Sequence, residues 1–145
     1  IRHVNDNADV WAELWREEVR LGAVPYYLFV ARNTGPRSYF EGSLVRGLQI
    51  FSDAYRRVSG LSRTVRGPIM SVTPGKVLVE GVATIHGEKV FVLKMIQGRR
   101  PEWANRVFFA RFDPDATSFD QLEPALGARD FFFGHSNRYG KNNLQ

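Results

Sequence analysis

The spacing of apolar residues predicts a helix near the N-terminus. Apolar side chains recur there at helical intervals, at Val10, Trp11, Leu14, Trp15 and Val19. Asn7 or Asp9 is suited to cap the first turn, since a short polar side chain accepts hydrogen bonds from the free backbone N–H groups. Gly22 follows the last apolar position, where a left-handed residue commonly ends a helix.

The next segment, residues 24–31, is continuously apolar and rich in aromatic side chains. Such a run is typical of a parallel strand that is buried on both faces. A second apolar pattern with helical spacing follows at residues 43–58, and helix, strand, helix in this order indicates an α/β fold with a parallel sheet. One or two such units cannot close a parallel sheet, because each buried strand needs a neighbour on both sides. We therefore expect residues 1–66 to be the C-terminal part of an incomplete (β/α) barrel whose earlier strands are missing, or else to rely on a partner.

The pattern changes near residue 67 to short alternating strands. The strand-like segments are residues 68–72, 77–84, 89–96 and 107–112. His86-Gly87-Glu88 predicts a hairpin turn, residues 118–126 suggest a short helix, and the three phenylalanines at 131–133 suggest an apolar anchor. Residues 67–134 are thus expected to form a small antiparallel, β-rich extension of α+β class. The polar tail, residues 135–145, is expected to be disordered.

Composition excludes several kinds of function. No apolar run approaches the roughly 20 residues of a membrane helix, and the N-terminus lacks the pattern of a signal peptide. We therefore expect a cytoplasmic protein without a membrane partner. The net charge of +5 is dispersed, which argues against a nucleic-acid partner, and the three histidines have no metal-ligand spacing. The chain has no cysteine, so by itself it cannot hold a thiolate zinc site or a Cys-ligated iron–sulfur cluster.

Several short motifs occur in a recognisable order. They are Val4-Asn5-Asp6, Val24-Pro25-Tyr26-Tyr27, Phe40 before a helix that contains Gly47, Ser59-Gly60, and Pro68 followed by Pro74-Gly75-Lys76. From about Val4 to Lys76, this order resembles the C-terminal half of radical SAM proteins of the lysine 2,3-aminomutase family.

The resemblance implies a partial (β/α) barrel with a [4Fe–4S] cluster and S-adenosylmethionine at its open end, and pyridoxal phosphate as a further cofactor. The family's cysteine motif, Cys-x3-Cys-x2-Cys, is absent from this chain. The cluster and S-adenosylmethionine would therefore be held only by a full-length protein, and no catalysis is expected of this chain alone. We expect it to be a C-terminal fragment of a radical SAM isomerase; the alternative is a degenerate relative of the family.

The resemblance also assigns cofactor-facing residues. Lys76 stands where the family has its pyridoxal-phosphate lysine, although the glycine run before it is shortened to Gly75. The alternative is a lysine in an ordinary turn. Tyr27 could stack on a cofactor or pack in a core. Asn5 follows a predicted strand, where barrel enzymes place functional side chains, but it could equally serve as a helix cap.

Two positions bear on the substrate. Arg32 and Thr73 stand where lysine-specific family members have aspartates that pair with the substrate's side-chain ammonium. An arginine there would repel an ammonium and favour a carboxylate or phosphate through bidentate hydrogen bonds, unless it is only a solvated side chain. We therefore expect a small anionic or neutral substrate rather than lysine.

A second interpretation is open at this stage. Residues 67–133 could form a non-catalytic binding or oligomerisation module, and a homo-oligomer is compatible with both interpretations. The cysteine motif in the upstream reading frame would separate the two.

Overall fold

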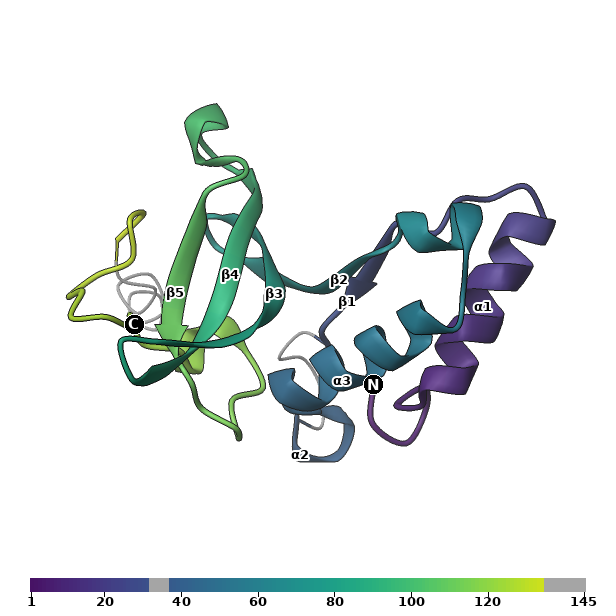
Figure 1. Ribbon diagram of the computed structural model, residues 1–145, viewed down its shortest axis with the longest axis horizontal. Helices are drawn as coiled ribbons and strands as arrows, with labels where there is room; N and C mark the ends of the chain where they lie inside the picture. The colour runs from purple at the N-terminus through teal and green to yellow at the C-terminus, as the bar shows by residue number, and fades with distance from the viewer. Residues whose placement is uncertain (32–36, 135–145) are drawn as a thin grey trace, which may run out of the picture.

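One open, five-stranded sheet in the order β1-β2-β3-β4-β5 runs through this mixed α/β molecule. The computed structural model describes residues 1–31 and 37–134 (Figure 1). The elements are α1 (Ala8–Arg20), β1 (Tyr27–Phe29), α2 (Arg37–Phe40), α3 (Leu44–Arg56), β2 (Arg66–Val72), β3 (Gly75–Ile85), β4 (Glu88–Gly98) and β5 (Val107–Arg111), with short 3-10 turns at Gly60–Thr64, Pro101–Trp103 and Phe119–Gln121. No helix among the described residues is both long and apolar enough to cross a membrane.

Both predicted long helices are confirmed, and side-chain caps fix where they begin. The Asn7 side chain accepts a hydrogen bond from the Asp9 backbone N–H at 2.7 Å, and α1 ends one residue before the cap Leu21. At α3, the Ser43 hydroxyl accepts from the Arg46 backbone N–H at 3.2 Å. Each cap satisfies a backbone donor that the first helical turn leaves unpaired.

β1 lies parallel to β2, as the sequence pattern predicts, with Tyr27 opposite Arg66 and Phe29 opposite Ile69. The strand is nevertheless only three residues long and lies at the edge of the sheet. Tyr26 is 62% exposed and Phe29 46% exposed. The prediction that residues 24–31 form a strand buried on both faces is therefore wrong, because α1 and α3 pack only against the Leu28 face of β1.

The remaining strands pair antiparallel, and the predicted hairpin between β3 and β4 is confirmed. His86 and Gly87 have φ angles of 48° and 78°, the left-handed pair that suits a two-residue hairpin turn. The predicted helix at 118–126 is wrong. Only Phe119–Gln121 forms a 3-10 turn, after which Pro124 bridges to Ala110 beside β5. A proline has no N–H for a helix, whereas it can lie at such an edge.

Two apolar clusters hold the molecule together. The larger lies between β2–β5 and the C-terminal segment, where Phe91, Leu93, Phe119 and Phe131 are buried. This placement confirms the predicted anchor at 131–133. The smaller lies between α1, α3 and Leu28 of β1. β2 begins at Arg66, so the parallel pair and the antiparallel strands belong to one sheet across the 66/67 boundary expected from sequence.

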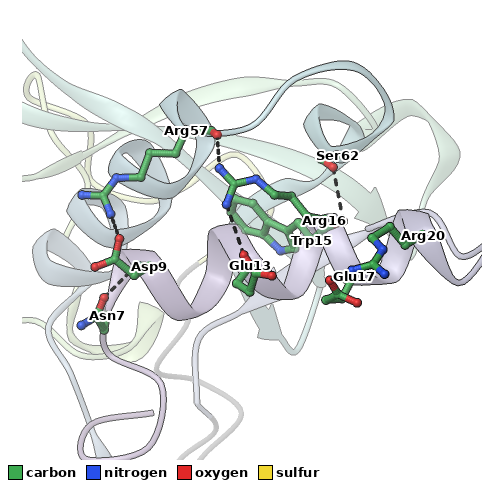
Figure 2. A network of polar contacts seen from close by, with 9 residues as sticks. All are labelled: Asn7, Asp9, Glu13, Trp15, Arg16, Glu17, Arg20, Arg57 and Ser62. Carbon is green, nitrogen blue, oxygen red and sulfur yellow. Dashed lines mark hydrogen bonds and ion pairs between the residues drawn. The ribbon is translucent and has the colours of Figure 1, made fainter.

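Polar contacts join α1 to the segment that follows α3. The Arg16 guanidinium donates to the Arg57 backbone carbonyl at 2.5 Å, and Arg57 pairs with Asp9 (Figure 2). The buried Ser62 hydroxyl donates to the backbone carbonyl of Trp15 at 3.3 Å. These contacts hold α1 against the segment that follows α3. Successive side chains of a strand point to opposite faces, so Tyr27 and Phe29 lie on the face of β1 opposite to that of Leu28.

Candidate functional site

Lys76 lies at the second position of β3, where three strands meet. It is opposite Ser71 of β2 and Gln97 of β4, and its side chain is half-buried. The preceding residue must be glycine, because a Cβ at Gly75 would overlap the backbone carbonyl of Gln97. Gly75 therefore allows the backbones of β3 and β4 to approach closely immediately before Lys76.

The Lys76 amine extends across the sheet to the aromatic side chains of β1. Its Nζ lies 5.5 Å from the centre of the Tyr27 ring and 6.0 Å from that of Phe29, within the range of cation–π attraction. The amine forms no hydrogen bond or ion pair with any residue that the structure describes. Lys76 therefore presents an uncommitted cationic nitrogen beside two aromatic rings.

A second cation shares the Tyr27 ring. The Arg66 guanidinium carbon lies 5.1 Å from the centre of the Tyr27 ring and 5.5 Å from that of Tyr26. The two tyrosine rings stack with their centres 3.9 Å apart and their planes 24° apart, and Phe29 meets Tyr27 edge-on at 5.5 Å. Tyr26, Tyr27 and Phe29, with Arg66 and Lys76, form what we call the Tyr27 site.

The Tyr27 hydroxyl is held in its neutral form. A side-chain hydrogen bond with Tyr26 and partial burial both raise the pKa of Tyr27 above its usual value of about 10, although the nearby positive charge of Arg66 acts in the opposite direction. At neutral pH, Tyr27 is therefore a hydrogen-bonding group and an aromatic surface, and it carries no negative charge to neutralise the two cations.

The structure brings some of the predicted residues together and separates others. Lys76 and Tyr27 meet directly. Asn5 lines a cavity of about 210 Å³ between the N-terminal segment, β1 and α3, and Phe29 of the Tyr27 site lines the same cavity. Its side-chain oxygen accepts from the Ile1 ammonium at 2.8 Å, and its backbone carbonyl accepts from the Trp11 indole N–H at 2.7 Å. Asn5 does not cap α1, because Asn7 does so.

Thr73 occupies the exposed turn between β2 and β3. It lines a cavity of about 140 Å³ to which Ala31, Ser71 and Asp120 also contribute. Arg32 lies outside the described residues, so its role as a substrate anchor remains a prediction. Thr73 lies only three positions before Lys76 in the sequence, but Lys76 does not line this cavity.

Sequence reasoning missed Arg66. No spacing rule singles it out, because its importance depends on the parallel register that sets it opposite Tyr27, 39 positions earlier in the chain. The described residues contain no group of three or more His, Cys, Asp or Glu side chains able to hold a metal ion. The chemistry available at this site is thus that of an amine, a guanidinium and aromatic rings.

Comparison of the chain with protein-family models, with curated proteins and with solved structures finds no match.

Proposed function

We propose that this chain is the C-terminal part of a radical SAM enzyme resembling the lysine 2,3-aminomutase family, and that Lys76 is its pyridoxal-phosphate lysine. One observation carries the proposal: the Lys76 amine lies uncommitted beside the rings of Tyr27 and Phe29. An amine of this kind is able to attack an aldehyde, provided that it is deprotonated.

The side chains at the Tyr27 site fit pyridoxal phosphate. The cofactor combines an aldehyde, a planar aromatic ring and a phosphate, and the site offers a primary amine, aromatic rings and a guanidinium. When bound, the cofactor supplies an aromatic system that withdraws electrons from an attached amino group. Lys76 would hold it, and Tyr27 and Phe29 would limit how its ring is oriented.

The iron–sulfur cluster does not fit this chain. The chain contains no cysteine, which is the ligand that such clusters require. Under the proposal, the cluster and S-adenosylmethionine are bound by another part of a longer protein. The role proposed for these residues is to position the cofactor and the substrate.

The arrangement of β1 supports the proposal of an incomplete barrel. β1 and β2 are parallel, with α1 and α3 packed against the Leu28 face of β1 (Figure 1). The outer edge of β1 has no strand partner among the described residues. In a longer protein, a preceding parallel strand could pair there, as in a (β/α) barrel with its helices outside.

The proposed substrate is anionic or neutral. Thr73 provides a neutral hydroxyl where lysine-specific proteins have a carboxylate, and the cavity that it lines also includes Ala31, the neighbour of Arg32. A cationic substrate side chain would lose a charge-assisted hydrogen bond worth about 1.5–3 kcal/mol at each missing carboxylate.

Reductive labelling tests the role of Lys76. The protein is incubated with pyridoxal phosphate, treated with borohydride to make the bond permanent, and mapped by peptide mass spectrometry. We expect Lys76 to be labelled first and Lys76→Ala to abolish this label.

Lys89 is the matched control, because its Nζ also lies over a ring, 3.8 Å from the centre of Phe112. Lys94 is a second control, with its Nζ 3.7 Å from Glu80. Equal labelling of Lys76 and Lys89 would contradict the cofactor role and favour the non-catalytic module.

A further inference from the structure

We infer that Arg66, beside the positively charged Lys76, is the anchor of an anion site over the Tyr27 ring, and that this site binds the phosphate of a phosphorylated planar molecule. The inference deepens the proposed function, on which the identification of pyridoxal phosphate as the ligand rests. It assigns to Arg66 a role as the phosphate anchor, separate from the covalent role of Lys76.

The geometry brings two positive groups to one ring. Arg66 is fixed by the parallel register, with Tyr27 as its direct partner, and by the hydrogen bond from its backbone N–H to the Tyr26 carbonyl at 3.0 Å. Its guanidinium lies 5.1 Å from the Tyr27 ring centre, and the Lys76 amine lies 5.5 Å from the same centre.

Neither cation pairs with a carboxylate of any residue that the structure describes. All fifteen Asp and Glu residues of the chain fall within the described residues, and none pairs with Arg66 or Lys76. Other cations of the chain have such partners: Lys94 pairs with Glu80, and Arg57 with Asp9. The Tyr27 site thus concentrates uncompensated positive charge on an aromatic surface.

The chemistry of the two cations selects a phosphate on a planar ring. A guanidinium presents parallel N–H donors that match two phosphate oxygens, whereas an ammonium adds a point charge. The exposed tyrosine stack, with Tyr26 62% exposed, offers a flat surface for a ring attached to that phosphate. Pyridoxal phosphate and a nucleoside monophosphate share these features, so the experiment must separate them.

The test uses ligands that cannot react with lysine. Pyridoxine phosphate and pyridoxine both lack the aldehyde and differ only in the phosphate, so the ratio of their dissociation constants measures phosphate recognition. By calorimetry, we expect wild type to bind the phosphorylated form about tenfold or more tightly, as a charge-assisted hydrogen bond implies. Arg66→Gln should reduce that ratio to near one.

Arg100→Gln is the matched control, because Arg100 also lies over an aromatic ring, 5.5 Å from the centre of Trp103. It should leave the ratio unchanged, and Arg66→Lys should give an intermediate ratio. Arg66 is exposed, so its variants are expected to keep the circular dichroism spectrum and urea midpoint of wild type.

Equal affinity of wild type for the two ligands, or an unchanged ratio in Arg66→Gln, overturns the inference. Binding of inorganic phosphate as tight as that of pyridoxine phosphate also overturns it, because the ring would then contribute nothing. Arg66-dependent binding of pyridoxine phosphate without reductive labelling of Lys76 supports the anion site while the proposed function fails. Tighter, Arg66-dependent binding of adenosine monophosphate supports the site with a nucleotide as its ligand.

Discussion

The two edges of the sheet differ in whether other residues cover them. At β5, the chain covers its own edge: Pro124 bridges to Ala110, and the Arg111 N–H donates to the Glu123 carbonyl at 2.8 Å. At β1, the outer edge has no described partner, and aromatic side chains next to it are exposed. Proteins normally protect a sheet edge, and among the described residues this protection is present at β5 and absent at β1.

The largest expected effect on stability comes from truncating Phe119, a core side chain near the covered edge at β5. Phe119 is 2% exposed and packs against Phe108, Phe131 and Phe133. Phe119→Ala should lower the free energy of unfolding by about 3–5 kcal/mol, measured by urea denaturation, because it leaves a cavity in the core. Phe29→Ala at the open edge should cost about 0.5 kcal/mol, since that side chain is 46% exposed. Similar losses in the two variants would contradict the contrast between the edges.

A smaller effect is expected where β1 meets β2. A Cβ added at Gly67 would lie 2.8 Å from the Cβ of Leu28 and 2.9 Å from its carbonyl oxygen. Gly67→Ala should therefore cost about 1–3 kcal/mol of stability. It should also speed hydrogen exchange at the Val30 N–H, which donates to the Ile69 carbonyl across this pair.

Gly81→Ala serves as the control for the β1–β2 junction, because a Cβ at Gly81 in β3 would meet no atom within 4 Å. If both alanine variants lose the same stability, the close approach of β1 to β2 is not the cause.

The smallest expected effect concerns association of the chain with itself. Phe29→Lys should lower self-association several-fold in sedimentation experiments, because a charged side chain discourages strand pairing at an open edge. Val107→Lys is the matched control at the covered edge, where Val107 is 50% exposed. A wild-type chain that stays monomeric at high concentration would show that the β1 edge does not pair with another copy.

Much of the fold can be predicted from residues that lie close together in the sequence. The cap at Asn7 and the turn at His86 and Gly87 are decided by residues only a few positions apart, so their structures follow from propensity and spacing. The segment at 118–126 shows where this reasoning fails. Its apolar spacing favours a helix, but pairing of Pro124 with Ala110 overrides the local preference.

The edge position of β1 could not be predicted from its apolar run. Such a run indicates which side chains favour burial, but it carries no information about which element covers them. The Tyr27 site shows the same limit: the motif around Lys76 is visible in the sequence, whereas Arg66 reaches the site only through a pairing between distant segments. Arg32 and the tail at 135–145 lie outside the described residues, so the predictions made for them stand untested.

The register of the sheet also has a consequence for the order of folding. β3 and β4 are joined by two residues, so their pairing closes a short loop, whereas the pairing of Tyr27 with Arg66 must first close the long crossover through α3. The entropy of loop closure makes such non-local parallel pairing the slower event. The hairpin that carries Lys76 can thus form before the tyrosines reach it. The amine and its aromatic neighbours come together only when β1 docks, and a ligand that bridges them would hold this late-forming strand in place.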